Sequence, residues 1–178
     1  PTPPTPPPPA PYPQFAGWAN LTPFAVLNRY QFAAGPAPQF KLRSRAYADE
    51  YNEVKTVGSF AVRNAAPDSE ESRTARYFPG GGANLNAIAR AVVAGRPLDR
   101  WQHARLFALL NMAVNDALIT TFYVKYRYTF WRPYTAIHWV DDGNVRTQPD
   151  PNWTSYLATP PYPDYPCGLP TTMGAGAQ

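Results

Sequence analysis

The sequence predicts an all-α fold: a helical bundle around one long central helix, with a proline-rich extended N-terminal arm and a proline-rich C-terminal loop. Apolar residues recur at helical spacing in four stretches of the chain, and prolines concentrate in residues 1–13 and 147–166, outside those stretches. The 178 residues are enough for one domain with a substantial core. We therefore expect an arm over residues 1–16 and one helical domain over residues 17–178.

The arm holds nine prolines in its first 13 residues, a composition that favours an extended polyproline conformation. Such a segment is ordered only when its own domain or a partner holds it. Residues 17–40 then mix aromatic residues with turn formers. This mixture predicts an irregular loop held against the core.

The first predicted helix covers residues 44–57 and ends at Gly58. A second begins at Asp68, because Glu71 stands three residues later in a capping-box position. It ends near the breaker that starts at Pro79. Both helices are predicted from local signals alone.

The third predicted helix, residues 83–94, places four apolar residues on one face: Leu85, Ile88, Ala89 and Val92. The fourth, residues 98–126, is apolar almost all round and would span roughly 43 Å. Its polar residues favour the buried helix of a soluble domain over a membrane span: Arg105, Asn111, Asn115 and Asp116. We expect the three last of these to fix packing between helices.

After Arg132 and Pro133 the helical pattern breaks, and residues 141–144 predict a solvated turn. Residues 147–166 are expected to form an extended loop, and residues 171–178 the first turns of a further helix.

Composition narrows the classes of function. Hydrophobic residues make up 44% and charged residues 16%, which excludes a charge-solvated disordered chain. The net charge of +4 comes mainly from scattered arginines, which favours oxyanion recognition over a nucleic-acid surface. The single cysteine excludes an internal disulfide. The proline-rich start without an initiator methionine predicts a processed, extracytoplasmic protein, periplasmic or secreted.

Lys125 stands at the end of the long predicted helix and Arg132 one loop or turn later, with aromatic residues between them. A lysine and an arginine held close together can bind one oxyanion through charge-assisted hydrogen bonds. The alternative is a pair of solvated cations, which a helix C-terminus also favours. Spacing alone leaves both interpretations open.

The order Lys, six residues, Arg-Pro is similar to the first signature of the vanadium-dependent haloperoxidases and of the related type 2 phosphatidate phosphatases and bacterial acid phosphatases. Further ordered blocks resemble the bacterial haloperoxidase-like branch: GWANLTPF, YADEYNEVKTVGS, ARLFALLNMAVNDA, KYRYTFWRPYTAI, DDGN and PDPNWTSYLATPPYPDYP. The resemblance implies an all-helical bundle that holds vanadate or phosphate. It also implies that Lys125 and Arg132 bind the oxygens of that anion.

The second signature of that family is Pro-Ser-Gly-His, where serine and glycine contact the oxyanion and histidine transfers protons. This chain has Pro166-Cys167-Gly168-Leu169, so Cys167 and Gly168 are the matching oxyanion candidates, and Leu169 cannot transfer a proton. A nucleophilic role for Cys167 is the sharper alternative. The third signature would lie beyond Gln178, and we expect the chain to be incomplete there.

His103 and His138 match no family position, and we expect both to be structural. No metal site is predicted, because neither histidine has ligand spacing with other histidines or the cysteine.

Together these features predict a haloperoxidase-like domain with a degenerate oxyanion site, acting as a non-catalytic structural or accessory subunit of a larger assembly. A protein partner would cover the apolar face of the long helix and the arm. The alternative is a fragment of an active vanadium-dependent haloperoxidase or acid phosphatase-like enzyme. We expect no cofactor under the first hypothesis and vanadate under the second.

Overall fold

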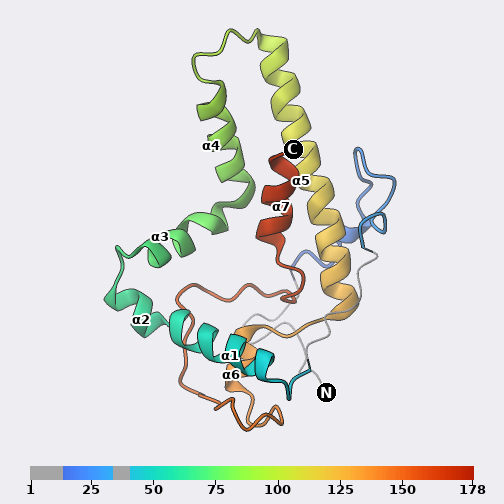
Figure 1. The fold of residues 1–178 in the computed structure, drawn as a ribbon. Coiled ribbons are helices and arrows are strands. Elements are labelled where there is room, and N and C mark those ends of the chain that lie inside the picture. The colour runs from blue at the N-terminus through green and yellow to red at the C-terminus, as the bar shows by residue number, and fades with distance from the viewer. Residues whose placement is uncertain (1–13, 34–40) are drawn as a thin grey trace. The chain divides into compact units, whose positions relative to one another are not determined.

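The computed structural model describes residues 14–33 and 41–178, and within them it contains helices and no β-strand (Figure 1). The predicted all-α fold is confirmed. The proline arm up to residue 13 and residues 34–40 of the predicted loop lie outside the described residues. The helices, with η marking 3-10 helices, are η1 (Trp18–Asn20), α1 (Arg45–Val57), α2 (Phe60–Ala65), α3 (Glu70–Tyr77), η2 (Phe78–Gly80), α4 (Gly81–Val93), α5 (Arg100–Tyr128), α6 (Pro133–His138) and α7 (Gly168–Gly176).

The described residues form two compact units, which we describe separately. Unit 1 comprises residue 14, residues 41–76 and residues 125–165. Unit 2 comprises residues 15–33, 77–124 and 166–178. Most of α5 therefore belongs to unit 2, and its last turn belongs to unit 1.

Unit 1 is built on the packing of α1 against α6. Ser44 caps α1 by accepting a hydrogen bond from the backbone N–H of Tyr47 at 3.1 Å, and Gly58 ends the helix as predicted. The core cluster is aromatic and aliphatic: Tyr47, Tyr51, Trp131, Ala136, Ile137 and Trp153. The predicted loop 147–166 crosses this core, and Trp153 Nε1 donates to the carbonyl of Lys55 at 2.8 Å.

Three local predictions for unit 1 are corrected. The helical pattern does not break after Pro133, because helix α6 begins there. Proline suits the first position of a helix, where a backbone N–H would have no intrahelical partner. Ser69 precedes α3, and its Oγ, not the Asp68 carboxylate, accepts from the N–H of Ser72 at 3.2 Å. The short helix α2 was not predicted.

The predicted turn at residues 141–144 is less solvated than expected. Asn144 is buried and donates to the carbonyls of Leu42 and Ser44 at 2.7 and 3.0 Å. The Asp142 carboxylate accepts from the Thr147 hydroxyl. This turn therefore anchors the start of α1 to the following loop.

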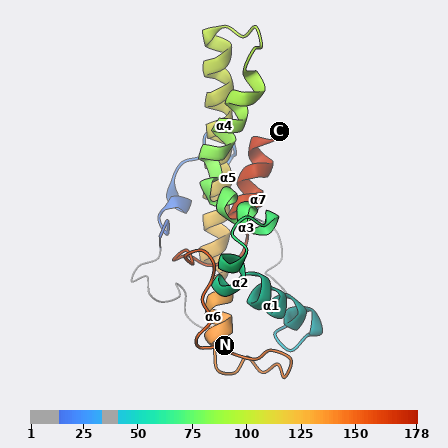
Figure 2. The ribbon, with the colours of Figure 1, turned by 90° about the vertical axis from the view of Figure 1, so that its left-hand side faces the viewer.

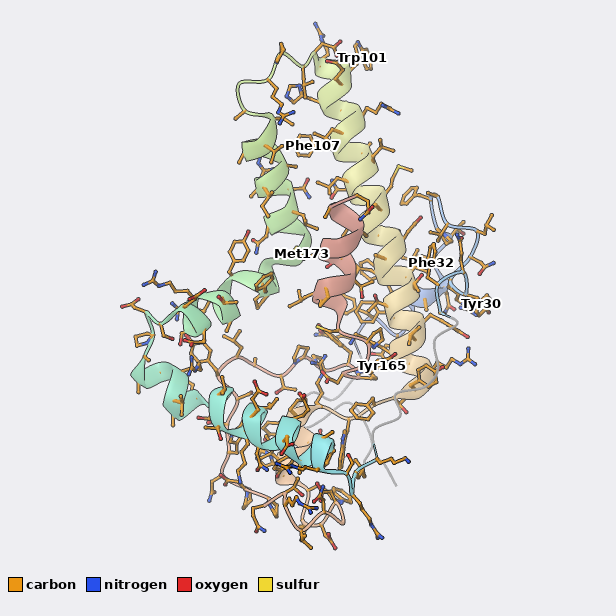
Figure 3. All side chains as sticks on the ribbon, viewed as in Figure 1. Tyr30, Phe32, Trp101, Phe107, Tyr165 and Met173 are labelled. Atoms are coloured by element: carbon orange, nitrogen blue, oxygen red, sulfur yellow. The ribbon has the colours of Figure 1, made fainter. Side chains whose placement is uncertain are left out.

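Unit 2 contains α4, α5 and α7: α4 packs against α7, and the ribbon of α7 lies beside α5 (Figures 1 and 2). Its core cluster consists of Leu85, Leu110 and Val114, and Phe107 and Met173, labelled in Figure 3, pack against it. A Cβ on Gly176 would lie 2.9 Å from Leu85 Cδ1, so a larger residue in α7 would require the end of the Leu85 side chain in α4 to shift.

The buried face of α4 differs from the prediction. Leu85 and Val93 are buried, whereas Ile88 and Val92 are 45% and 55% exposed. The third helix also begins earlier than expected, at Gly81. Helix α7 likewise begins at Gly168 instead of Thr171.

The loop of residues 15–33 is held on α5, as predicted for the part that the structure describes. The Asp116 carboxylate is 3% exposed and accepts from the N–H groups of three consecutive residues, Phe24, Ala25 and Val26, at 2.8, 2.8 and 3.1 Å. Asp116 thus fixes a loop and not the helix packing that we expected of it. Asn111 does join two helices, because its side-chain amide exchanges two hydrogen bonds with Asn86 of α4.

One helical stretch, Arg100–His138, is long and apolar enough to cross a membrane by length and composition, and 33% of its most apolar window is buried. The core helix of a soluble protein meets the same criteria. Exposed apolar side chains on this stretch include Trp101 at its N-terminal end (Figure 3) and Leu109, which are 77% and 50% exposed.

Candidate oxyanion-binding site

Lys125 lies in the last turn of α5 and is 2% exposed. Its ammonium group donates to the carbonyls of Pro163 and Asp164 at 2.8 and 2.7 Å. A buried ammonium group is costly unless acceptors surround it, so these carbonyls fix its position. The negative end of the α5 macrodipole favours a cation at this place as well.

Arg132 is the residue that precedes α6, with an extended backbone that turns the chain out of the α5 direction. Its Nε donates to the carbonyl of Tyr162 at 2.7 Å, and its Nη1 lies 3.1 Å from Asp164 Oδ1. The Arg132 side chain is 14% exposed. These contacts engage two of the five N–H donors of the guanidinium, so the planar group retains donors that an anion can use.

The two cations meet on one short segment, residues 162–164. Lys125 Nζ lies 5.3 Å and Arg132 Cζ 4.7 Å from the centroid of the Tyr162 ring. Both distances are within the range of cation–π attraction. The structure therefore brings Lys125 and Arg132 together and excludes the alternative of two solvated side chains. Their binding of an oxyanion stays a prediction.

The aromatic residues between the two cations are built into unit 1. Trp131 is 2% exposed and stacks on Tyr47 with ring centroids 6.5 Å apart. Tyr128 makes an edge contact with Tyr165, labelled in Figure 3, at 6.2 Å. Burial raises the pKa of Tyr126, whose hydroxyl donates to the carbonyl of Gln14. These contacts pack the aromatic side chains between Lys125 and Arg132 against other residues of unit 1.

Cys167 and Gly168 belong to unit 2. Cys167 is an exposed free thiol at the position before α7, and Gly168 is the first residue of that helix. A Cβ on Gly168 would lie 3.7 Å from Thr121 Cγ2, an ordinary van der Waals contact with α5. Whether Cys167 and Gly168 meet Lys125 and Arg132 stays a prediction.

The two histidines occupy ordinary helical positions. His103 Nδ1 lies 2.9 Å from the carbonyl of Asp99, and His138 Nδ1 lies 2.7 Å from the carbonyl of Tyr134. The His138 ring also stacks on the Tyr134 ring, with centroids 4.1 Å apart. Within residues 14–33 and 41–178, no three His, Cys, Asp or Glu side chains gather where they could hold a metal ion. These contacts support the structural roles that we expected.

Comparison with known proteins matches the helices of this site to one family. Residues 105–178 match the model of the VCPO second helical-bundle domain. The chain is 28% identical to the vanadium chloroperoxidase of Curvularia inaequalis over 185 aligned positions, which cover 85% of this chain. The solved structure of a bacterial vanadium-dependent iodoperoxidase superposes with a TM-score of 0.81 and 27% identity over 99% of this chain. All three similarities support the haloperoxidase superfamily that the sequence motifs resemble.

This haloperoxidase-like chain spans only part of its relatives' length. It covers 29% of the Curvularia inaequalis protein and 43% of the iodoperoxidase chain.

The haloperoxidase-like site also contains residues that sequence reasoning missed. Asp164 contacts both cations, and Tyr162 presents its ring to both. The only signal for them was an acidic residue beside a tyrosine in a proline-rich loop, at a sequence separation of 30 to 39 residues from the cations. A contact of that separation is not encoded in local spacing.

The donor set fits vanadate or phosphate. A point-like ammonium group and a planar guanidinium complement a tetrahedral anion, because one neutralises its charge and the other can bind two of its oxygens. Lys125 and Arg132 are the residues that would hold it. Bound vanadate would supply an electrophilic centre for peroxide chemistry, which bound phosphate would not.

Proposed function

We propose that this chain is a haloperoxidase-like domain that binds a tetrahedral oxyanion through Lys125 and Arg132 without catalysing turnover. The observation that carries the proposal is the convergence of both cations on residues 162–164. Two like charges held close together repel each other, and an anion bound between them would relieve that repulsion. The proteins that the chain is similar to are named for vanadium-dependent chemistry, which supports an oxyanion ligand.

The non-catalytic part of the proposal depends on Leu169, in the first turn of α7. By resemblance, this position carries the histidine that transfers protons in the family. An isobutyl side chain has no titratable group and cannot replace it. We propose that Lys125 and Arg132 hold and orient the anion, and that no side chain at position 169 moves a proton to or from it.

An accessory role is supported by apolar side chains that stay exposed on α4 and α5. They are Ile88, Val92, Trp101 and Leu109, each at least 45% exposed. Exposed apolar surfaces of this kind are typical of protein–protein contacts. We propose a protein partner for this surface, and the extracytoplasmic location stays a prediction.

Vanadate titration tests the binding step directly. Vanadium NMR of the wild-type chain should show the free-vanadate signal decreasing and broadening as protein is added. Lys125→Met should weaken this binding about ten- to hundredfold, since it removes charge-assisted hydrogen bonds to the anion. Lys55→Met is the matched control, because Lys55 also donates to a backbone carbonyl in unit 1, that of Gln148 at 2.6 Å. Equal effects of the two substitutions would refute a specific site at Lys125.

Activity assays separate the proposed function from the alternative. The rates of bromide oxidation with vanadate and peroxide, and of hydrolysis of a simple phosphate ester, should both equal the rates in buffer without protein. The structural similarity to an iodoperoxidase favours the alternative of an active enzyme. Turnover that Lys125→Met abolishes and Lys55→Met leaves intact would establish that alternative.

A further inference from the structure

Asp164 is bonded at three points to the segment that carries the cations. Its N–H donates to the carbonyl of Phe130 at 3.0 Å, and its carbonyl accepts from Lys125 Nζ at 2.7 Å. Its carboxylate accepts from Arg132 Nη1 at 3.1 Å. The backbone contacts hold residue 164 in place whatever its side chain is, and the side chain adds a negative charge beside the guanidinium.

The ion pair of Asp164 and Arg132 is unequally buried. The Arg132 side chain is 14% exposed, and the Asp164 side chain is 40% exposed. Solvent therefore screens the carboxylate, and such a pair contributes little to stability. Its effect on the charge of the site remains, because Lys125, Arg132 and Asp164 together carry one net positive charge instead of two.

An anion bound by the remaining N–H groups of Arg132 would lie close to this carboxylate. Each negative charge on the anion is attracted by the two cations and repelled by Asp164. A second negative charge on the anion doubles its attraction to the two cations and also doubles its repulsion by the Asp164 carboxylate. A carboxylate at this position therefore disfavours a doubly charged anion more than a singly charged one.

We propose that Asp164 tunes the charge selectivity of the site: its carboxylate favours a tetrahedral anion with one negative charge over one with two, relative to the same site without that carboxylate. This inference rests on the oxyanion binding proposed above for Lys125 and Arg132. It assigns a specificity role to a residue outside the two signatures that identified the site. Dihydrogen vanadate and dihydrogen phosphate are anions of the favoured class.

Perrhenate and tungstate test the selectivity without any change in protonation. Both are tetrahedral metal oxyanions of similar size, and at mildly alkaline pH they carry one and two negative charges. Isothermal titration calorimetry at constant ionic strength gives the ratio of the tungstate to the perrhenate association constant. In Asp164→Asn this ratio should rise about tenfold over the wild type, which corresponds to roughly 1.4 kcal/mol.

Asp49→Asn is the matched control. It makes the same change of net charge in unit 1 and removes the carboxylate from a more exposed arginine pair, Arg45 and Asp49 at 3.6 Å. The ratio should stay within about twofold of the wild type in this variant. Thermal unfolding checks that Asp164→Asn folds, and Asp164→Ser serves as a second neutral variant if it does not.

The outcomes distinguish this inference from the function on which it rests. If the association constants of both anions change by the same factor in the neutral variants, Asp164 only orients Arg132 or competes with every anion. Selectivity by charge is then wrong, and the oxyanion site itself stands. If neither anion binds the wild type or the variants, both the selectivity and the proposed oxyanion site are wrong.

Discussion

Helix α5 carries two buried charges nine residues apart, Asp116 in unit 2 and Lys125 in unit 1, and their surroundings differ. The Asp116 carboxylate is bonded to three successive backbone N–H groups of one loop, which are neutral donors. The Lys125 ammonium is bonded to two carbonyls, but a second cation, Arg132, contacts the same segment. The neutral backbone N–H groups are sufficient for Asp116, whose carboxylate only holds a loop. Two like charges on one segment repel each other, and the Asp164 carboxylate paired with Arg132 offsets only part of that repulsion, which is consistent with the anion binding proposed above.

The largest effect should come from breaking the Asp116 contact. Asp116→Ala removes the acceptor of three charge-assisted hydrogen bonds, and we expect it to lower the free energy of unfolding by about 3 kcal/mol in urea denaturation. Asp141→Ala is the control, because that carboxylate accepts one backbone N–H, from Gly143, in an exposed turn. It should cost under about 1 kcal/mol. Similar losses in the two variants would show that Asp116 does not anchor the loop.

The same contact should depend on pH. Burial alone would raise the pKa of Asp116, but hydrogen bonds from the N–H groups of Phe24, Ala25 and Val26 and from Asn115 outweigh it and lower the pKa. A lowered pKa in the folded state means that the ionised carboxylate stabilises the fold above the unfolded value of about 3.9, and that this contribution disappears as the pH falls through the folded value. The difference in unfolding free energy between the wild type and Asp116→Asn should therefore narrow below about pH 4. A difference that stays constant down to acid denaturation would contradict this account.

Lys125→Met should cost less stability than the loss of Asp116. The substitution leaves two carbonyls without their donor, but it also removes the repulsion between Lys125 and Arg132. We expect a loss of about 1.5 kcal/mol in the unfolding free energy, measured without any oxyanion present. Added vanadate should raise the melting temperature of the wild type and leave that of the variant unchanged. A loss as large as that of Asp116→Ala would indicate that Lys125 serves folding alone.

Local signals predicted those parts of the fold that local chemistry determines. Helix α1 begins and ends where Ser44 and Gly58 predict, and α5 was evident from its apolar length. Spacing alone left open whether Lys125 and Arg132 meet or are two solvated cations. The family resemblance implied an oxyanion site at these two residues.

Tertiary contacts decided what local signals could not. The buried face of α4 is set by its contact with α7, and this contact leaves Ile88 and Val92 exposed. Asp116 was expected to fix helices, but its partners lie about 90 residues away in a loop with no regular structure. Asp164 likewise reaches Arg132 across 32 residues, so its effect on the charge of the site appears only in the folded chain.

The smallest effect should come from a pair of buried threonines in unit 2. Thr121 is 1% exposed, and its hydroxyl has no hydrogen-bond partner among the described residues, whereas Thr172 is 4% exposed and its hydroxyl donates to the carbonyls of Gly168 and Leu169 at 3.0 Å each. Valine has the shape of threonine without the hydroxyl. Thr121→Val should therefore raise the free energy of unfolding by about 1 kcal/mol, and Thr172→Val should lower it by a similar amount. Urea denaturation gives the free energy of unfolding of both variants. If Thr121→Val is destabilising, the Thr121 hydroxyl is hydrogen-bonded to a group outside the protein chain, such as a bound water or ligand.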